Sequence, residues 1–545
     1  MEQLEKTKLH TLKPADGFRL FMSMEINSKI AVNLLRMSRI VTLEPPPGIR
    51  ASLLQTLHGI PTERMDRQPA ERSRVYFLLA WLHALVQERL RYAPVGWSKK
   101  YEFSESDLRV GLSTVDSWID RTTGGSGSNI APERIPWTAL KALLSQCIYG
   151  GRVDNAFDRH LLDAFLSHLF VAQSFDIDFA LVNSSTNNET PHAGVVIPDA
   201  RNKAEYLAWV EQWSGESSES PMLLGLHANA DSALHATLAK RLRTNLQTVQ
   251  VSVGVGVGAV EGETSAEDLK ATEKNVNHRN AAELAAKWLA ALPEDVKELR
   301  RDNDNIKQPL FRCFEREVSG GKQLLRKVRR ALTLVIGVCN GDKQSNKGRA
   351  LLHDILMATI PHAWRRYTVP VGLALPEWMV DFTARMTQLQ SISAGVEQGE
   401  LLQDIWLGGL MYPEAYITAT RQAVAQANKW SLEELSLQLQ LDVSDGSATS
   451  GFMVTSLYID GAKPDPQAGL SLDTRGSVEM MSKNKLVWIH ESSNTAAQTS
   501  DHLTLPLYLN HSRQNLLSTA AVHCSIPQVK VYQRAVALYA SVVGK

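Results

Sequence analysis

A change in hydrophobic period within the last third of the chain constrains the fold more than any other feature of the sequence. Between Pro413 and Trp430, apolar residues recur at steps of three and four, which indicates one buried face of a helix. Pro413 suits the first turn of this helix, where its missing N–H has no partner to lose. From Leu435 to Val443 every second residue is apolar, which predicts a strand with one buried face. The chain therefore changes from helical to stranded structure at the end of the segment Trp406–Glu434.

The residues that follow continue the stranded pattern. Leucine alternates with other residues from Leu503 to Leu509, and Gly, Pro, Asp and Asn turns separate the strand candidates. Short strands at such spacing are typical of a small barrel or sandwich. We therefore predict an all-β region, either a barrel or a sandwich, over residues 446–545. Its candidate strands are residues 454–459, 486–489, 503–509, 516–522 and 536–542.

Two further strand candidates, Phe18–Met24 and Arg39–Leu43, lie near the start of the chain with a helical turn between them. A strand, a crossover and a second strand predict a parallel pair, and parallel strands are normally buried on both faces of a larger sheet. Two strands cannot form such a sheet alone. Residues 1–50 are therefore expected to be a short, truncated remnant of an α/β domain.

The two regions between these ends are predicted to be helical, which makes the whole a multidomain, mainly α protein. The first spans residues 51–235, and the second spans residues 236–445 with a polar insert at 247–280. Alternating glycines in the insert do not match the G-x-G-x-x-G spacing of a nucleotide loop. We interpret the insert as a low-complexity linker, with room for a short strand at 249–255.

The composition excludes several classes of function. Lys+Arg and Asp+Glu both number 58, so the chain lacks the basic excess of a general nucleic-acid or membrane-surface binder. The longest apolar run, Val75–Val86, is too short to cross a bilayer, and no membrane insertion is expected. The four cysteines form no C-x-x-C pair, so they indicate reduced thiols in a cytosolic protein rather than a zinc site or a disulfide framework.

The residues themselves offer no catalytic, cofactor-binding or metal-binding constellation. His83 is close in sequence to Gln87, Glu88 and Arg89, which suggests a catalytic or metal cluster at first. The H-E-x-x-H pattern is absent, however, and a histidine on an apolar helix is more often a hydrogen-bonded core residue. We favour that interpretation for His83, and we expect Arg89 and Arg91 to make buried or ring contacts, because they follow a buried face.

Three features of the second helical region also fail as sites. Gly320-Gly321-Lys322 is not a phosphate loop, because the lysine is followed by Gln323 rather than serine or threonine. Residues 302–305 begin like a calcium loop, but Lys307 occupies a position that needs glycine. The basic run over residues 322–330 is interpreted as a solvated helix face, with contact to an acidic partner as the alternative.

Eight runs of residues carry a resemblance to a known family. They are Phe18-Arg-Leu-Phe, His83-Ala-Leu-Val-Gln-Glu-Arg, Pro94-Val-Gly-Trp, Tyr149-Gly-Gly-Arg-Val-Asp, Gly225-Leu-His-Ala-Asn, Trp406-Leu-Gly-Gly-Leu, Pro413-Glu-Ala-Tyr-Ile-Thr-Ala-Thr-Arg-Gln and Val531-Tyr-Gln-Arg-Ala-Val-Ala-Leu. In this order they resemble the C-terminal part of dynein heavy chains, and the cytoplasmic type is the closer match. At Ala228 the sequence departs from the family, which usually has proline there.

The resemblance implies an assignment for each region. Residues 1–50 would end the large subdomain of the sixth AAA+ module, and residues 51–235 would be its helical lid. Residues 236–445 and 446–545 would be the helical and β parts of the C-terminal domain. Arg36 and Arg39 lie where some AAA+ modules place an arginine finger, and a surface arginine or a ring contact is the alternative interpretation.

The resemblance also implies a function for the intact protein, an ATP-driven, minus-end-directed microtubule motor in the cytoplasm. ATP and Mg would bind in upstream AAA+ modules, so the chain itself is expected to be inactive and to supply ring closure and the regulatory C-terminal domain. The upstream modules would be direct partners, while microtubules and the dynein intermediate, light intermediate and light chains would bind elsewhere. The alternative is a stand-alone, non-motor scaffold or binding module derived from dynein.

Overall fold

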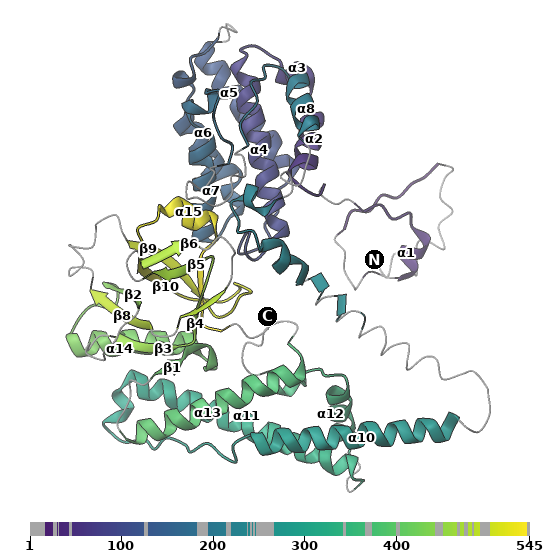
Figure 1. Cartoon of the computed structure of the whole chain (residues 1–545), viewed down its shortest axis with the longest axis vertical. Coiled ribbons are helices and arrows are strands. Elements are labelled where there is room, and N and C mark those ends of the chain that lie inside the picture. Colours follow the sequence, from purple (N-terminus) through teal and green to yellow (C-terminus); the bar gives the residue numbers. More distant parts are fainter. Residues whose placement is uncertain are drawn as a thin grey trace. The chain divides into compact units, whose positions relative to one another are not determined.

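The computed structural model divides the chain into two compact units, Met1–Pro47 and Gly48–Lys545 (Figure 1). The structure describes residues 17–24, 30, 32–42, 46–124, 129–182, 195–213, 220–236, 238–239, 242–243, 246, 266–341, 345–365, 373–398, 404–441, 451–465, 469–472, 478–481, 484–490 and 502–541.

The first unit contains one short helix, α1 (Val32–Met37), within its described residues. Residues 18–24 and 39–42 carry no strand, so the prediction of two strands there is wrong. Phe21 is 90% exposed and Val41 is 74% exposed. A strand needs a hydrogen-bonded neighbour and a surface to pack on, and the described residues of this unit supply neither.

The second unit begins with a set of helices that we call the helical block, residues 48–236. Its helices are α2 (Ile49–Gly59), α3 (Thr62–Met65), α4 (Glu71–Arg91), α5 (Glu105–Thr123), α6 (Trp137–Leu143), α7 (Ala156–Leu169) and α8 (Lys203–Gln212). Helix α4 is buried along almost its whole length, and α2, α3, α5 and α7 all pack against it (Figure 1). Ser104 and Asp107 form a capping box that begins α5.

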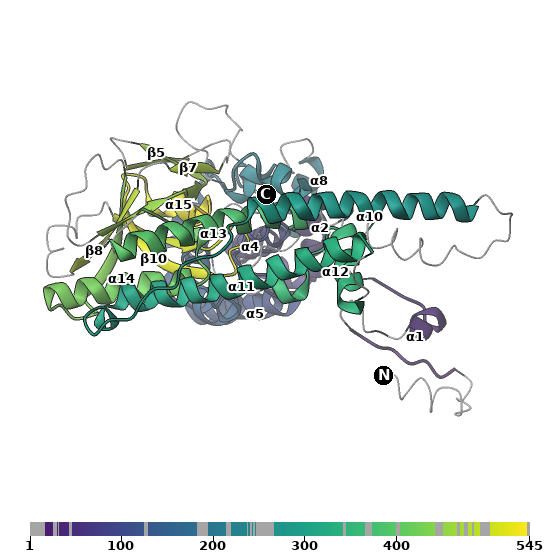
Figure 2. The same cartoon turned by 90° about the horizontal axis from the view of Figure 1, so that it is seen from below.

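Four helices follow, and we call them the helical half of the C-terminal block. They are α10 (Ala266–Ala291), α11 (Pro309–Cys339), α12 (Asn346–Leu356) and α13 (Leu375–Glu397). Helix α11 contacts the other three and runs alongside α13 (Figure 2). The segment 247–265 and its candidate strand lie outside the described residues. The linker interpretation is wrong for residues 266–280, because α10 packs on α11 from Ala281 onward and each added residue extends it by one hydrogen bond.

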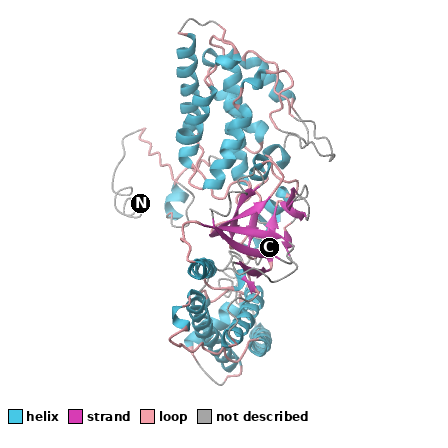
Figure 3. Cartoon of the chain, turned by 90° about the vertical axis from the view of Figure 1, so that its left-hand side faces the viewer, coloured by secondary structure: helices cyan, strands magenta, loops and turns pink. Residues whose placement is uncertain are grey.

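The sheet half of the C-terminal block consists of a nine-stranded mixed sheet with the order β1-β3-β8-β2-β10-β9-β11-β4-β7. Figure 3 shows the strands in magenta. Its strands are β1 (Ile405–Trp406), β2 (Leu435–Leu441), β3 (Gly451–Thr455), β4 (Leu457–Asp460), β7 (Glu479–Met481), β8 (Asn484–His490), β9 (His502–Tyr508), β10 (Leu516–His523) and β11 (Ala537–Tyr539). Strands β5 (Ala462–Asp465) and β6 (Gly469–Leu472) form a separate ribbon. Helix α14 (Pro413–Asn428) contacts β10, and α15 (Gln528–Gln533) precedes β11.

The two blocks have separate hydrophobic cores. One cluster of buried side chains extends from Ile49 to Ala230, and the other extends from Ala281 to Ala540. The second core includes both the helical half and the sheet half, so these two halves fold around common side chains. Among the described residues, no helix is long and apolar enough to cross a membrane.

Candidate functional site

The polar cluster noted on α4 does not converge on one point. His83 Nδ1 lies 3.0 Å from the hydroxyl of Tyr149 in the buried core, which confirms the core interpretation of this histidine. Burial lowers the pKa of His83 to about 4, so the ring is neutral at physiological pH. Glu88 instead accepts a hydrogen bond from the backbone N–H of Gly48 at 3.0 Å. Arg89 donates from Nε to the carbonyl oxygen of Gly96 at 3.0 Å, away from His83.

The basic run on α11 is only partly a solvated face. Arg326, Lys327 and Arg330 are exposed, as predicted. Arg329 instead donates from Nη1 to the carbonyl oxygens of Leu289, Leu292 and Pro293 at 3.2, 3.0 and 3.1 Å. Leu289 lies in the last turn of α10, and Leu292 and Pro293 follow its end. The guanidinium of Arg329 therefore caps a helix terminus, and the solvated-face prediction is wrong for this residue.

The other features noted in the sequence lie apart from one another. Gly320-Gly321-Lys322 lies inside α11, and the ammonium of Lys322 is 3.2 Å from Asp295. Lys322 is buried, so the solvated-face prediction is wrong for this residue as well. Arg36 and Arg39 are both exposed in the first unit. Within the ranges that the structure describes, no group of three or more His, Cys, Asp or Glu residues is placed to hold a metal ion.

The functional candidate that the structure does bring together is the boundary joint, where the helical block meets the sheet half. We define it as Arg89, the segment 221–226, and Gln533 and Arg534 at the end of α15. Arg89 is 0% exposed, and its guanidinium donates to the carbonyl oxygen of Leu224. Its Nη1 and Nη2 also donate to the carbonyl oxygen of Gln533, at 3.3 and 3.4 Å. The expected buried contact of Arg89 is thus confirmed, and it links the two blocks. Arg91, by contrast, is exposed and pairs with Glu88, so the expectation of a buried contact is wrong for that residue.

Two further contacts and one close approach of the backbone lie at the same boundary. Arg534 Nη1 donates to the carbonyl oxygen of Leu226 at 3.0 Å, opposite in direction to Arg89. The rings of His160 on α7 and Tyr532 on α15 stack with centroids 5.3 Å apart. Gly225 has φ +76°, and a Cβ added there would lie 3.2 Å from Cβ of Gln533. Glycine therefore allows both the left-handed turn and the close approach.

Charged groups are also buried beside the joint. Asp158 on α7 accepts hydrogen bonds from the hydroxyls of Ser98 and Tyr101 at 2.5 and 2.7 Å. Burial raises the pKa of the Asp158 carboxyl, and those hydrogen bonds oppose the rise. Across the boundary, Arg513 donates to Asp460 at 3.2 Å and to the carbonyl oxygen of Ala535 at 2.7 Å. A cavity of about 30 Å³ lies between Asp158 and Arg513, which is enough for a bridging water.

A second joint fastens the two halves of the C-terminal block, and we call it the glycine turn, residues 405–412. The amide of Gln388 on α13 makes two hydrogen bonds to the backbone of Trp406, at 2.9 and 3.1 Å. Arg385 on the same helix donates to the carbonyl oxygen of Leu410 at 3.0 Å. Glu317 on α11, which is 0% exposed, accepts from the backbone N–H groups of Met411 and Tyr412 at 2.9 and 2.6 Å.

The opposite side of the glycine turn packs against the end of β11. A Cβ added to Gly408 would lie 2.7 Å from Cβ of Ser541 and 2.8 Å from the carbonyl carbon of Ala540. Real Cβ atoms essentially never approach other atoms within 3.0 Å. Only glycine therefore fits at Gly408 without a shift of the backbone.

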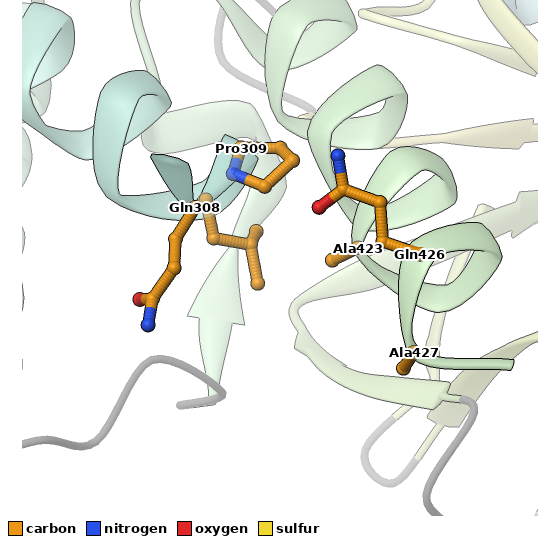
Figure 4. Close-up of a pocket in the computed structure, with 6 residues that line it drawn as sticks. Gln308, Pro309, Ala423, Gln426 and Ala427 are labelled. Atoms are coloured by element: carbon orange, nitrogen blue, oxygen red, sulfur yellow. The ribbon is translucent and has the colours of Figure 1, made fainter. Parts of the chain in front are cut away.

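An open surface depression lies where the start of α11 meets the end of α14 (Figure 4). It has a volume of about 370 Å³ and is lined by Gln308, Pro309, Leu310, Ala423, Gln426 and Ala427. The lining holds no charged or nucleophilic side chain, so it offers no catalytic chemistry.

Sequence reasoning missed most residues of both joints. Glu317 and Arg385 lie in no recognised motif, and their bonds to the glycine turn go to backbone groups, which any residue can supply. The available signals were the runs that carry the family resemblance, because Gly225, Gly408 and Arg534 lie inside three of them.

Comparison with known proteins accounts for almost the whole chain. Residues 72–230 match the AAA lid domain of the dynein heavy chain, and residues 237–540 match the C-terminal domain of the dynein heavy chain. The chain is 44% identical to the cytoplasmic dynein heavy chain of Drosophila melanogaster over 99% of its own length and 12% of that relative. It is 40% identical to the cytoplasmic dynein heavy chain of Dictyostelium discoideum over 94% of its own length and 11% of that relative. It is 27% identical to dynein axonemal heavy chain 5 of Mus musculus over 97% of its own length and 11% of that relative.

The chain thus spans 11–12% of the length of these relatives. The matched domains follow the order of the two blocks, and the boundary joint lies between them. The chain therefore belongs to the dynein heavy chain family and corresponds to the C-terminal region of its cytoplasmic members.

Proposed function

We propose that this chain acts as the C-terminal region of a cytoplasmic dynein heavy chain, in a motor that moves toward microtubule minus ends by hydrolysing ATP. The observation that carries the proposal is the match of both blocks, in order, to the lid and C-terminal domains of that family. In such a motor, ATP and Mg bind in upstream modules, and this region supplies the last lid and the domain attached to it.

The finer assignments follow from this role. Residues 1–50 end the large subdomain of the sixth AAA+ module, where upstream strands of the same module would pair with 18–24 and 39–42. The exposure of Phe21 and Val41 supports this, because both side chains would be covered in a complete sheet. The sheet half forms the β part of the C-terminal domain, a small barrel or sandwich. Its support is that leucines of β9 and strands on both sides of it enter one core.

The boundary joint explains how the C-terminal block can influence a motor that has its ATP sites elsewhere. A lid in such a ring moves when nucleotide-driven changes in the upstream modules shift its own module, and a domain bonded to the lid must move with it or resist. The C-terminal block therefore influences how the modules move together, and hence processivity and force. The upstream modules are its direct partners, while microtubules and the intermediate, light intermediate and light chains bind other regions, in the cytoplasm on the microtubule cytoskeleton.

A chimera tests the proposal. This chain replaces the matching region of the Dictyostelium cytoplasmic dynein heavy chain, to which it is 40% identical. Microtubule gliding and microtubule-stimulated ATP hydrolysis are expected to be retained. The control is the same heavy chain ended before this region. A chimera that folds but performs no better than the control would overturn the proposal.

A further inference from the structure

The boundary joint contains two arginines that donate in opposite directions. Arg89, on α4 of the helical block, reaches the carbonyl oxygen of Gln533 in the sheet half. Arg534, the next residue in the sheet half, reaches back to the carbonyl oxygen of Leu226 in the helical block. Each block thus supplies one guanidinium and one backbone acceptor, so separation of the blocks breaks both sets of hydrogen bonds together.

The surroundings of Arg89 make this exchange sensitive to opening. Within the described part of the protein, its guanidinium bonds to carbonyl oxygens of Gly96, Leu224 and Gln533, and no carboxylate lies within ion-pair distance of it, although the charge of Asp158 acts on it from further away. Burial lowers the pKa of Arg89 to about 9. A buried cation that has no carboxylate within ion-pair distance is costly to keep dry. When the two blocks separate, water can hydrate the guanidinium of Arg89, which partly compensates for the hydrogen bonds that are lost. This lowers the free-energy cost of separation, so the joint can open reversibly.

The acceptors lie on short segments that can carry a displacement. Leu224 and Leu226 flank Gly225, whose left-handed backbone packs against Gln533. The segment begins with the 3-10 turn η7 (Pro221–Leu224), and on the other side α15 contacts α7. A shift of either segment changes the geometry of both arginine bonds.

We propose that Arg89, Arg534 and their carbonyl acceptors form a reciprocal latch that makes the segment 221–226 and the end of α15 open and close as one cooperative unit. This deepens the proposed function, on which its meaning for a motor rests, because the latch is the point where movement of the lid reaches the C-terminal domain. Arg89 and Arg534 are positioning residues in this role.

Hydrogen exchange of the 545-residue protein, measured by mass spectrometry, tests the latch. Arg89→Met alters a buried side chain and is the harder variant to fold, so Arg534→Ala is the primary variant. Arg534→Ala is expected to speed exchange about tenfold in peptides covering 221–226 as well as in those covering 528–535, as for loss of one charge-assisted hydrogen bond. Arg534→Lys, which keeps one donor and the charge, should restore part of the protection.

Arg159→Ala is the matched control, because Arg159 Nη2 donates to the carbonyl oxygen of Val153 at 3.1 Å within the helical block. Its effect should stay near residues 153–159. The latch is refuted if Arg534→Ala speeds exchange in 528–535 alone, or if Arg159→Ala gives the same pattern. An inactive chimera combined with coupled exchange would overturn the motor role and leave the latch, whereas an active chimera with uncoupled exchange would do the reverse.

Discussion

Replacement of Gly408 by alanine tests whether the glycine turn fastens the helical half to the sheet half. The added Cβ would lie 2.7 Å from Cβ of Ser541 and 2.8 Å from the carbonyl carbon of Ala540, where ordinary contact begins at 3.4 Å. The obstruction includes backbone, so the atoms must separate by moving the turn or the end of β11. Forced overpacking of this kind costs about 1–3 kcal/mol, and we expect the upper end because no flexible side-chain tip can give way.

The assay is urea unfolding of the 545-residue protein, followed by far-ultraviolet circular dichroism and tryptophan fluorescence. The control is Gly59→Ala at the end of α2, where an added Cβ meets no atom within 4 Å. Alanine there should leave the free energy of unfolding unchanged or raise it by about 0.5–1 kcal/mol. The reasoning fails if Gly408→Ala lowers the midpoint no more than Gly59→Ala does, because the close approach to Ala540 would then not constrain the fold.

Other substitutions separate satisfied from unsatisfied buried groups. The pKa of His83 is lowered to about 4 in the folded protein, whereas an unfolded histidine has a pKa of about 6.5. As the pH falls from 7 to 5, the unfolded chain therefore binds a proton that the folded protein does not, and the free energy of unfolding should fall by about 2 kcal/mol. His83→Gln should remove that part of the pH dependence, and an unchanged dependence would contradict it. Tyr149→Phe should cost about 1–2 kcal/mol in urea unfolding, because it takes a partner from His83. Tyr416→Phe should be neutral or stabilising by up to about 1 kcal/mol, because its buried hydroxyl has no partner among the described residues, and a clear loss would be inconsistent with that. Glu317→Gln should cost about 2 kcal/mol in the same assay, because an NH₂ group would face a backbone N–H, whereas an unaltered midpoint would contradict the turn-anchoring role.

Hydrophobic period predicted the local elements well where local sequence decides them. The change from helix to strand lies where the pattern placed it, since α14 ends at Asn428 and β2 begins at Leu435. The pattern failed where the backbone conformation of a single residue divides one apolar run into two strands. The candidate strand 454–459 is divided at Ser456, which has φ +58°, into β3 and β4, and these strands lie far apart in the sheet order. A positive φ at serine carries no sequence signal comparable to that of glycine.

The strands expected near the start of the chain failed for a different reason. Residues 18–24 and 39–42 have strand composition, but composition specifies only a preference for a pleated, half-buried surface. Among the described residues, no neighbouring strand covers them, and Phe21 stays 90% exposed. Strand formation is thus a property of the whole sheet, whereas α4 could be predicted from its own residues because its hydrogen bonds are internal.

The joints were beyond prediction because of the atoms that make them. Arg89 and Arg534 donate across the boundary joint to carbonyl oxygens, which every residue carries, so no partner residue marks these contacts in the sequence. A joint of this kind depends on the path of the backbone more than on a second side chain. Its sequence trace should therefore be glycine at points of close approach. Gly225 and Gly408 fit this reasoning, because each lies where an added Cβ would press on the opposite side of a joint.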